Sequence, residues 1–70
     1  MKIELKIIEN INVPDYDFEK YTCICKFPNL EVTGCDKDDV INNTKGIALC
    51  VIGQWECPPD MIEFIMLNNL

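Results

Sequence analysis

The stretch Gly34–Glu56, GCDKDDVINNTKGIALCVIGQWE, decides the fold, because it is the one segment long and periodic enough to form a substantial helix. Apolar or small side chains recur along it at i, i+4, i+7 and i+8, which is typical of a helix that buries one face. Asp36 is expected to cap the N-terminus, and Pro58 and Pro59 are expected to end the helix. The predicted buried stripe is Val40, Thr44, Ile47, Ala48, Val51 and Trp55, widened by Ile41 and Ile52.

Short alternating segments on both sides of this stretch predict strands that pack against the helix. Apolar and charged residues alternate over Lys2–Glu9, as they do in a strand with one buried face. The run Asn10–Lys20 is rich in turn-forming residues and is expected to connect two strands. The further predicted strands are Tyr21–Phe27, Leu30–Cys35 and Met61–Leu67.

The predicted element order is therefore β-β-β-α-β, an α+β fold in a single domain over residues 1–70. We expect a small, mostly antiparallel sheet with one long helix packed on one face. Gly34 is expected to supply a special backbone conformation before the helix. The last strand alternates weakly, so either both of its faces are covered or one face is an exposed apolar strip. The second-strand residues expected to face the helix are Tyr21, Cys23, Cys25 and Phe27.

The balance of charges narrows the classes of partner. Six lysines, no arginine and twelve acidic residues give a formal net charge of −6. This excess of acid argues against a nucleic-acid groove, which needs clustered basic side chains. It favours an acidic surface that attracts a basic partner, and the alternative is that the charge serves solubility alone.

The cysteine content and the hydropathy pattern predict a reduced, cytoplasmic protein. Five cysteines are an odd number, which fits a complete disulfide framework poorly. Alternating charges near the N-terminus interrupt the apolar core that a signal peptide needs, and no apolar run is long enough for a transmembrane helix. We expect the thiols to be mostly buried and reduced, with Cys57 the most exposed and oxidisable.

Residues suited to catalysis or metal binding are scarce. Histidine, the commonest general base and metal ligand, is absent from the sequence. Asp36, Asp38 and Asp39 suggest a magnesium site, but carboxylates in a first helical turn more often cap the helix and complement its dipole. An enzyme would need a cluster of carboxylates on the sheet, and we expect no enzyme activity, no metal and no cofactor. The candidates for such a cluster are Glu4, Glu31 and Glu63.

The runs Phe27–Leu30 (FPNL) and Gly34–Ala48 (GCDKDDVINNTKGIA) resemble two motifs in the N-terminal domain of HicB-type antitoxins. That domain typically carries V-P-D-L-P-G-C, a short strand, and then G-D-T-x-E-E-A-x-x-N-A-K-E-A. The run Phe27–Leu30, FPNL, is similar to the first motif, and Pro58 and Pro59 are similar to the proline pair after the family's helix. The similarity covers about residues 20–62. Matching places in the second motif are taken by Gly34, Asp38, Asp39, Asn43 and Lys45.

The resemblance implies a HicB-like domain with a β-β-β-α-β sheet, a degraded RNase H-like fold. It further implies a protein that self-associates and that covers the catalytic face of a small, basic, HicA-type mRNA-cleaving toxin. The Pro-Gly-Cys segment of the first motif is shortened in this chain. The chain ends at Leu70, where HicB antitoxins usually continue into a DNA-binding domain, so operator binding is not expected.

We therefore expect a non-enzymatic, acidic interaction module that binds and inhibits a basic protein, with a HicA-type toxin as the first candidate. The alternative is a phage-encoded inhibitor of a host defence nuclease such as a CRISPR effector (an anti-CRISPR protein), acting by protein binding or by mimicry of nucleic acid. We expect a homodimer through the last strand, and no direct contact with nucleic acid or membrane. The predicted partner-binding residues are Asp15, Tyr16, Asp17, Glu19, Ile24, Glu63 and Ile65.

Overall fold

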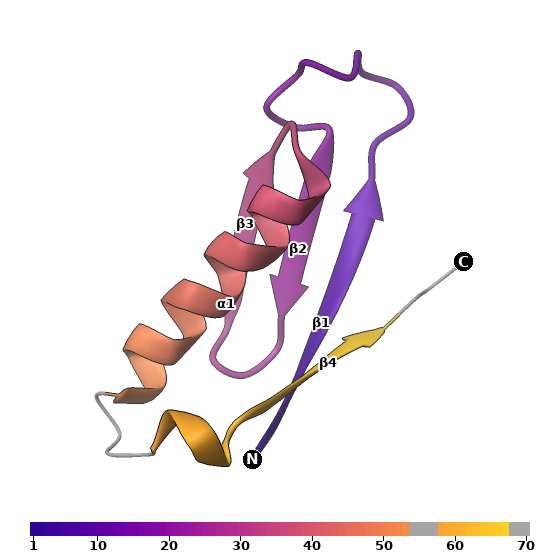
Figure 1. The fold of residues 1–70 in the computed structure, drawn as a ribbon. Helices are drawn as coiled ribbons and strands as arrows, with labels where there is room; N and C mark the ends of the chain where they lie inside the picture. The colour runs from indigo at the N-terminus through magenta and orange to yellow at the C-terminus, as the bar shows by residue number, and fades with distance from the viewer. Residues whose placement is uncertain (54–57, 68–70) are drawn as a thin grey trace.

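The computed structural model of the protein describes residues 1–53 and 58–67, and it places a helix against a four-stranded sheet (Figure 1). The order of these elements is β-β-β-α-β, as predicted, with a short 3₁₀ helix before the last strand. The strands are β1 (Lys2–Glu9), β2 (Tyr21–Cys25), β3 (Leu30–Gly34) and β4 (Glu63–Leu67). The helices are α1 (Lys37–Gly53) and the 3₁₀ helix η1 (Pro59–Met61).

The sheet has the strand order β3-β2-β1-β4 and is mixed. The pairs β1–β2 and β2–β3 are antiparallel, whereas β4 runs parallel to β1. The parallel pair follows from the route of the chain, because a connection through α1 returns it to the end of the sheet where β3 began. The predicted α+β class is confirmed, and its mostly antiparallel sheet contains this one parallel pair.

The core lies between α1 and the inner face of the sheet. α1 packs on β2 and β3, and Figure 1 shows it lying along these two strands. Ile3 and Leu5 on β1 face the helix side together with Cys23 and Cys25 on β2, and each of these four residues is at most 1% exposed. The buried residues of α1 are Val40, Thr44, Ala48 and Ile52.

The helix begins where the sequence predicts. The Asp36 carboxylate accepts hydrogen bonds from the backbone N–H groups of Asp38 at 2.9 Å and Asp39 at 3.2 Å. The Asp36 carbonyl accepts a third from the N–H of Val40 at 3.0 Å. The two bonds to the carboxylate satisfy donors that have no partner within the first helical turn, and the third is the first bond of the helix itself, so the predicted cap is confirmed.

α1 is described as far as Gly53. The predicted helical residues Trp55 and Glu56 lie outside the described residues, as does Cys57. Within residues 1–53 and 58–67, no helix combines the length and the apolar character that crossing a membrane requires.

The buried stripe of α1 differs from the predicted one at Ile47, which is 43% exposed. Val51, four residues further on, is only half-buried. The physical reason is the position of α1 over β2 and β3. The flank that carries Ile47 and Val51 borders an open groove beside Val32 on the edge strand β3. The buried positions therefore keep a strict spacing of four residues from Val40 to Ile52.

Three strands are shorter than the sequence predicts, and β3 differs by one residue because it ends at Gly34. β2 ends at Cys25, so Phe27 does not continue the inward-facing set and is 62% exposed. Tyr21, Cys23 and Cys25 do face the helix side, as predicted. The last strand begins at Glu63 because η1 occupies the preceding residues.

Gly34 has a different role from the predicted one. Its φ is not positive, so the turn into α1 requires no left-handed backbone conformation there. A Cβ added at this position would lie 2.7 Å from Cγ2 of Val40, which is far inside van der Waals contact. Glycine is therefore required by the close approach of the buried Val40 to the end of β3.

The edge strand β4 is attached to the start of the chain but is poorly covered. The amino group of Met1 donates to the carbonyl of Met61 at 2.7 Å, and the N–H of Glu63 donates to the carbonyl of Met1 at 2.8 Å. Met66 and Leu67 remain 36% and 39% exposed. Met66 lies on the helix side and Leu67 on the opposite side, so neither face of β4 is fully covered and the exposure is not confined to one apolar strip.

We predict that the substitutions Gly34→Ala and Gly46→Ala change stability in opposite directions. The added methyl at Gly34 collides with Val40, and such overpacking costs about 1–3 kcal/mol. Gly46 lies inside α1, where a Cβ would meet nothing within 4 Å. Alanine there removes the helix penalty of glycine and stabilises the fold by about 0.5–1 kcal/mol.

Urea denaturation followed by circular dichroism measures both free energies of unfolding. The double substitution Gly34→Ala with Val40→Ala is the control, because removing the opposing methyl should make the pair cost less than the sum of the two single changes. A stabilised Gly34→Ala variant would show that the close contact does not constrain this position.

Candidate protein-interaction site

The loop between β1 and β2, residues 10–20, lies beyond one end of the sheet and is internally ordered (Figure 1). The N–H of Asn10 donates to the carbonyl of Lys20 at 2.8 Å, which closes the loop at its base. Within the loop, the N–H of Asp17 donates to the carbonyl of Pro14 at 3.0 Å. The Asp17 carboxylate accepts from the N–H of Glu19 at 2.7 Å. These bonds give the loop a defined shape.

The side chain of Lys20 holds this loop from the inside and is only 7% exposed. Its ammonium nitrogen lies 3.3 Å from a carboxylate oxygen of Asp15 and 3.4 Å from one of Glu9, and it donates to the carbonyl of Val13 at 3.5 Å. Burial alone would lower the pKa of Lys20, but the hydrogen bonds and the attraction of Asp15 and Glu9 outweigh it and raise the pKa. Lys20 therefore stays charged and ties the loop to β1.

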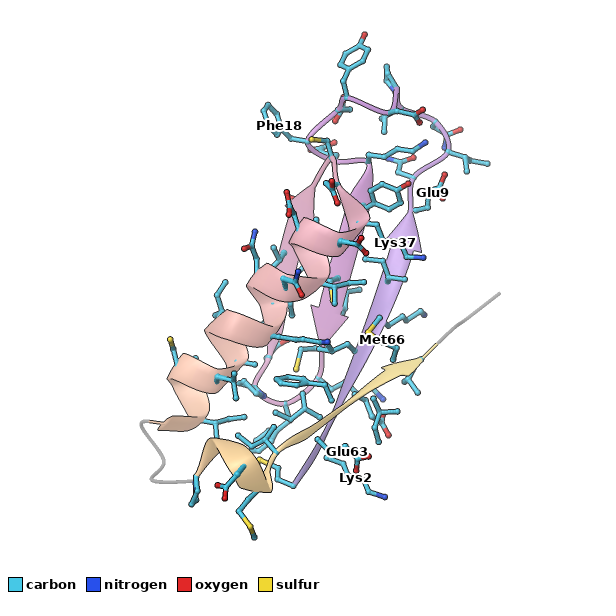
Figure 2. The ribbon with its side chains drawn as sticks, in the orientation of Figure 1. Lys2, Glu9, Phe18, Lys37, Glu63 and Met66 are labelled. Carbon is cyan, nitrogen blue, oxygen red and sulfur yellow. The ribbon has the colours of Figure 1, made fainter. Side chains whose placement is uncertain are left out.

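The outside of the loop presents large apolar side chains to solvent. Ile11 and Tyr16 are each 81% exposed, and Phe18 is 78% exposed. Figure 2 shows Phe18 pointing away from the sheet at the loop end of the molecule. Aromatic side chains on an ordered backbone lose little further freedom on binding, so this arrangement suits contact with another macromolecule.

The face of the sheet opposite α1 forms the second part of the candidate site, and we call it the outer face. Strand alternation and register place on it the residues whose neighbours along each strand point to the helix. It carries charged, hydroxyl and apolar side chains, and no described helix packs on it. Its members are Lys2, Glu4, Lys6, Ile8, Thr22, Ile24, Glu31, Thr33, Glu63, Ile65 and Leu67.

The structure divides the seven predicted partner-binding residues into two groups. Asp15, Tyr16, Asp17 and Glu19 lie together on the loop, with Asp17 half-buried and the others exposed. The remaining three are on the outer face: Ile24, Glu63 and Ile65.

The two groups lie at different ends of the sheet. Glu63 pairs with Lys2 at the start of β1, whereas the loop follows Glu9 at its end. Figure 2 shows the same separation, with Glu63 beside Lys2 and Glu9 beside the loop that carries Phe18. Ile24 lies between them, opposite Lys6. One compact contact surface therefore does not contain all seven predicted residues.

Sequence reasoning missed the residues that complete the loop. Phe18 and Ile11 are as exposed as Tyr16, although apolar residues between acidic ones are easily taken for core. Lys20 is the more informative omission, because it is the only base in the segment Asp15–Lys20, which contains three acidic residues. A single lysine in such a run is a signal for an internal ion pair.

The arrangement offers little for catalysis. Among the described residues, no group of three or more His, Cys, Asp or Glu side chains is placed to hold a metal ion. Glu4, Glu31 and Glu63 all lie on the outer face, but in separate rows opposite Ile65, Ile24 and Lys2. The spacing of these three carboxylates does not form a shared site.

The thiols described by the structure are free, and they fall into two environments. Cys23 and Cys25 are buried in the core, and burial raises the pKa of the Cys25 thiol. Cys35 and Cys50 are exposed. The buried pair therefore packs as small hydrophobic side chains, whereas Cys35 and Cys50 do not match the expectation that the thiols are mostly buried.

Comparison of the chain with protein-family models, with curated proteins and with solved structures found no match. Function is therefore argued from the residues of this chain.

We predict that Lys20→Met loosens the loop and lowers stability, whereas Lys26→Met does not. Methionine keeps most of the buried chain but leaves Asp15 and Glu9 without their shared cation. Lys26 is exposed and serves as the matched control. Hydrogen exchange should show faster exchange at the amides of Asn10 and Glu19 in the Lys20 variant only.

The pH dependence of this effect follows from the raised pKa of Lys20. A cation with a raised pKa in the folded state adds stability below its ordinary pKa of about 10.4 and loses it as pH rises through the raised value. The stability difference between the wild type and Lys20→Met should therefore hold from neutral pH to about pH 10 and shrink above it. An equal difference at all alkaline pH values would contradict an ionic role for Lys20.

Proposed function

We propose that this protein is a non-enzymatic inhibitor that binds a basic protein through the loop at residues 10–20. The observation that carries the proposal is the ordered display of Tyr16 and Phe18, which are 81% and 78% exposed. Acidic side chains surround them on the same loop, and they are Asp15, Asp17 and Glu19. Solvent-exposed aromatics inside an acidic rim match the anatomy of a protein-binding hot spot.

Two physical effects favour a basic partner. The net charge of −6 attracts a basic protein over distances of about a Debye length, and raises the association rate more than the final affinity. Burial of Tyr16 and Phe18 then supplies the affinity, because large aromatic anchors contribute most of the binding energy of an interface.

A HicA-type RNA-cleaving toxin is the first candidate partner. The support comes from the motif residues at Phe27–Leu30 and Gly34–Lys45, which resemble those of HicB-type antitoxins. A protein that binds RNA presents a basic surface, which is complementary to the acidic loop. We place the interaction in the cytoplasm, since free buried thiols such as Cys23 and Cys25 are typical of reducing compartments.

We predict that affinity capture from the native host, followed by mass spectrometry, recovers a small basic RNA-cleaving protein. Recovery should fall as salt rises, because exposed charges steer the encounter. The purified chain should then inhibit RNA cleavage by that protein at a one-to-one ratio. Capture of a CRISPR-type nuclease would replace the toxin assignment by the anti-CRISPR alternative and leave the basic-partner interaction intact.

The double variant Tyr16→Ala/Phe18→Ala tests whether the loop is the contact surface, and Phe27→Ala is its control. Loss of hot-spot aromatics weakens binding by about thirtyfold or more. Phe27 is a matched control, because it is 62% exposed but follows β2 at the end of the sheet away from the loop. Unchanged affinity in the loop variant, or an acidic partner, would refute the proposed mode of binding.

We also propose that two copies pair along the free edge of β4. An edge strand presents unpaired backbone groups, and β4 adds the exposed side chains of Met66 and Leu67. Sedimentation velocity should show twice the mass of the chain for the wild type and for Ile24→Lys. Ile65→Lys, which places like charges at the paired edges, should give a monomer, and a monomeric wild type would disprove the dimer.

A further inference from the structure

The outer face of the sheet is hollowed at its loop end. The hollow has a volume of about 440 Å³ and lies over parts of β1, β2 and β3, with the start and the end of the loop as its wall. Ile8 and Thr22 form part of its floor, and they lie opposite each other on neighbouring strands. Ile11 and Glu19 contribute from the two ends of the loop. The loop and the uncovered sheet face therefore meet in one concave surface.

The charge of this hollow is entirely negative. Glu9, Glu19 and Glu31 line it, and no basic side chain does. The negative charge of Glu9 is compensated by the ammonium of Lys20, which lies 3.4 Å from its carboxylate. In the part of the chain that the structure describes, neither Glu19 nor Glu31 forms an ion pair. Two unpaired carboxylates facing one concave surface leave an electrostatic preference for a cation.

The apolar part of the hollow distinguishes an organic cation from a metal ion. Ile8 is 41% exposed and Ile11 is 81% exposed, so the hollow offers apolar contact beside its carboxylates. The carboxylates come from three separate elements, and within the described residues no acidic group is compact enough for a metal. An arginine side chain fits both features, since its apolar stem packs against isoleucine while its planar head donates up to five hydrogen bonds.

We propose that this hollow binds an arginine side chain of the basic protein partner. The proposal rests on the function proposed above and adds the place and the chemistry of one contact. Thr22 and Thr33, which pair across β2 and β3, add hydroxyl acceptors for a guanidinium head beside Glu31. Tyr16 and Phe18 on the loop then contact the protein surface from which that arginine projects.

Lys20 is a positioning residue for the hollow. It neutralises Glu9 from the inner side and holds the loop that carries Glu19. Without it, the wall formed by the loop would not keep a fixed distance from Glu31. The hollow therefore depends on the same ion pairs that order the loop.

The test is an NMR titration of the ¹⁵N-labelled chain with Nα-acetyl-arginine methylamide. The amide signals of Ile8, Thr22 and Thr33 should shift and saturate, with weak affinity because a single side chain is the probe. The lysine analogue should bind more weakly, since it lacks the planar fork that reaches separated carboxylates. Raising the salt concentration should weaken both.

The variant Glu31→Gln should raise the dissociation constant by about fivefold, as expected for loss of an exposed charge pair. Glu4→Gln is the matched control, because it removes the same charge from the same sheet face but does not line the hollow. Equal weakening by both variants, or shifts spread evenly along β1, would overturn the proposal.

Failure of this inference is distinguishable from failure of the proposed function. If the captured basic protein binds through Tyr16 and Phe18 but no arginine probe shifts the hollow residues, only the hollow assignment is wrong. If the arginine probe binds in the hollow and the host yields no basic partner, the hollow stands and the inhibitor function falls.

Discussion

An α-helix is about 10 Å across and neighbouring strands lie about 4.8 Å apart, so one helix covers roughly two strands. This limit on coverage decides which parts of the sheet stay open. α1 packs on β2 and β3, so the helix backbone does not lie over the β1–β4 half of the inner face. Side chains provide most of the cover there. Lys45 reaches over that half, with its ammonium 5.7 Å from the ring centroid of Phe64. The described residues supply no helix for the outer face. The features suited to binding lie where this one helix does not reach.

The buried Lys20 offsets the repulsion between the acidic side chains of the loop. Asp15, Asp17 and Glu19 follow one another closely, and their repulsion would favour an open, disordered loop. Removing an ammonium from water is costly unless it is paired, and Lys20 has two carboxylates and a carbonyl around it. Its charge compensates Glu9 and the exposed Asp15. The carboxylates of Glu19 and Glu31 stay available on the outside.

Local patterns predicted the elements whose causes are local. The alternation of Lys2–Glu9 and the cap at Asp36 depend on neighbours in sequence, and both were found as expected. Ile47 and Gly34 were misjudged because their environments depend on where α1 crosses the sheet, which no local pattern contains. Phe27 was misjudged because alternation does not show where a strand stops.

Some features of the candidate site could likewise be predicted from local sequence, and others could not. The exposure of Asp15 and Glu19 on the loop could be predicted from the turn-rich sequence alone. The approach of Glu31 to Glu9 and Glu19 could not, because it requires the register of three strands. The separation of Glu63 from the loop likewise follows from the parallel pairing of β4 with β1, which places Glu63 opposite Lys2.

Under the proposed function, the placement of the lysines favours approach of a basic partner at the loop end, where the exposed Lys37 is accompanied by Asp36, Asp38 and Asp39. Lys2 lies at the start of β1 beside Glu63, and Lys6 lies at mid-sheet opposite Ile24. The loop contains no base except the buried Lys20. Lys2 and Glu9 are seven residues apart on a strand, roughly 23 Å, which exceeds a Debye length of about 8 Å. The two ends are therefore screened from each other, so under the proposed function a basic partner would approach the loop end and leave the edge of β4 for the proposed second copy.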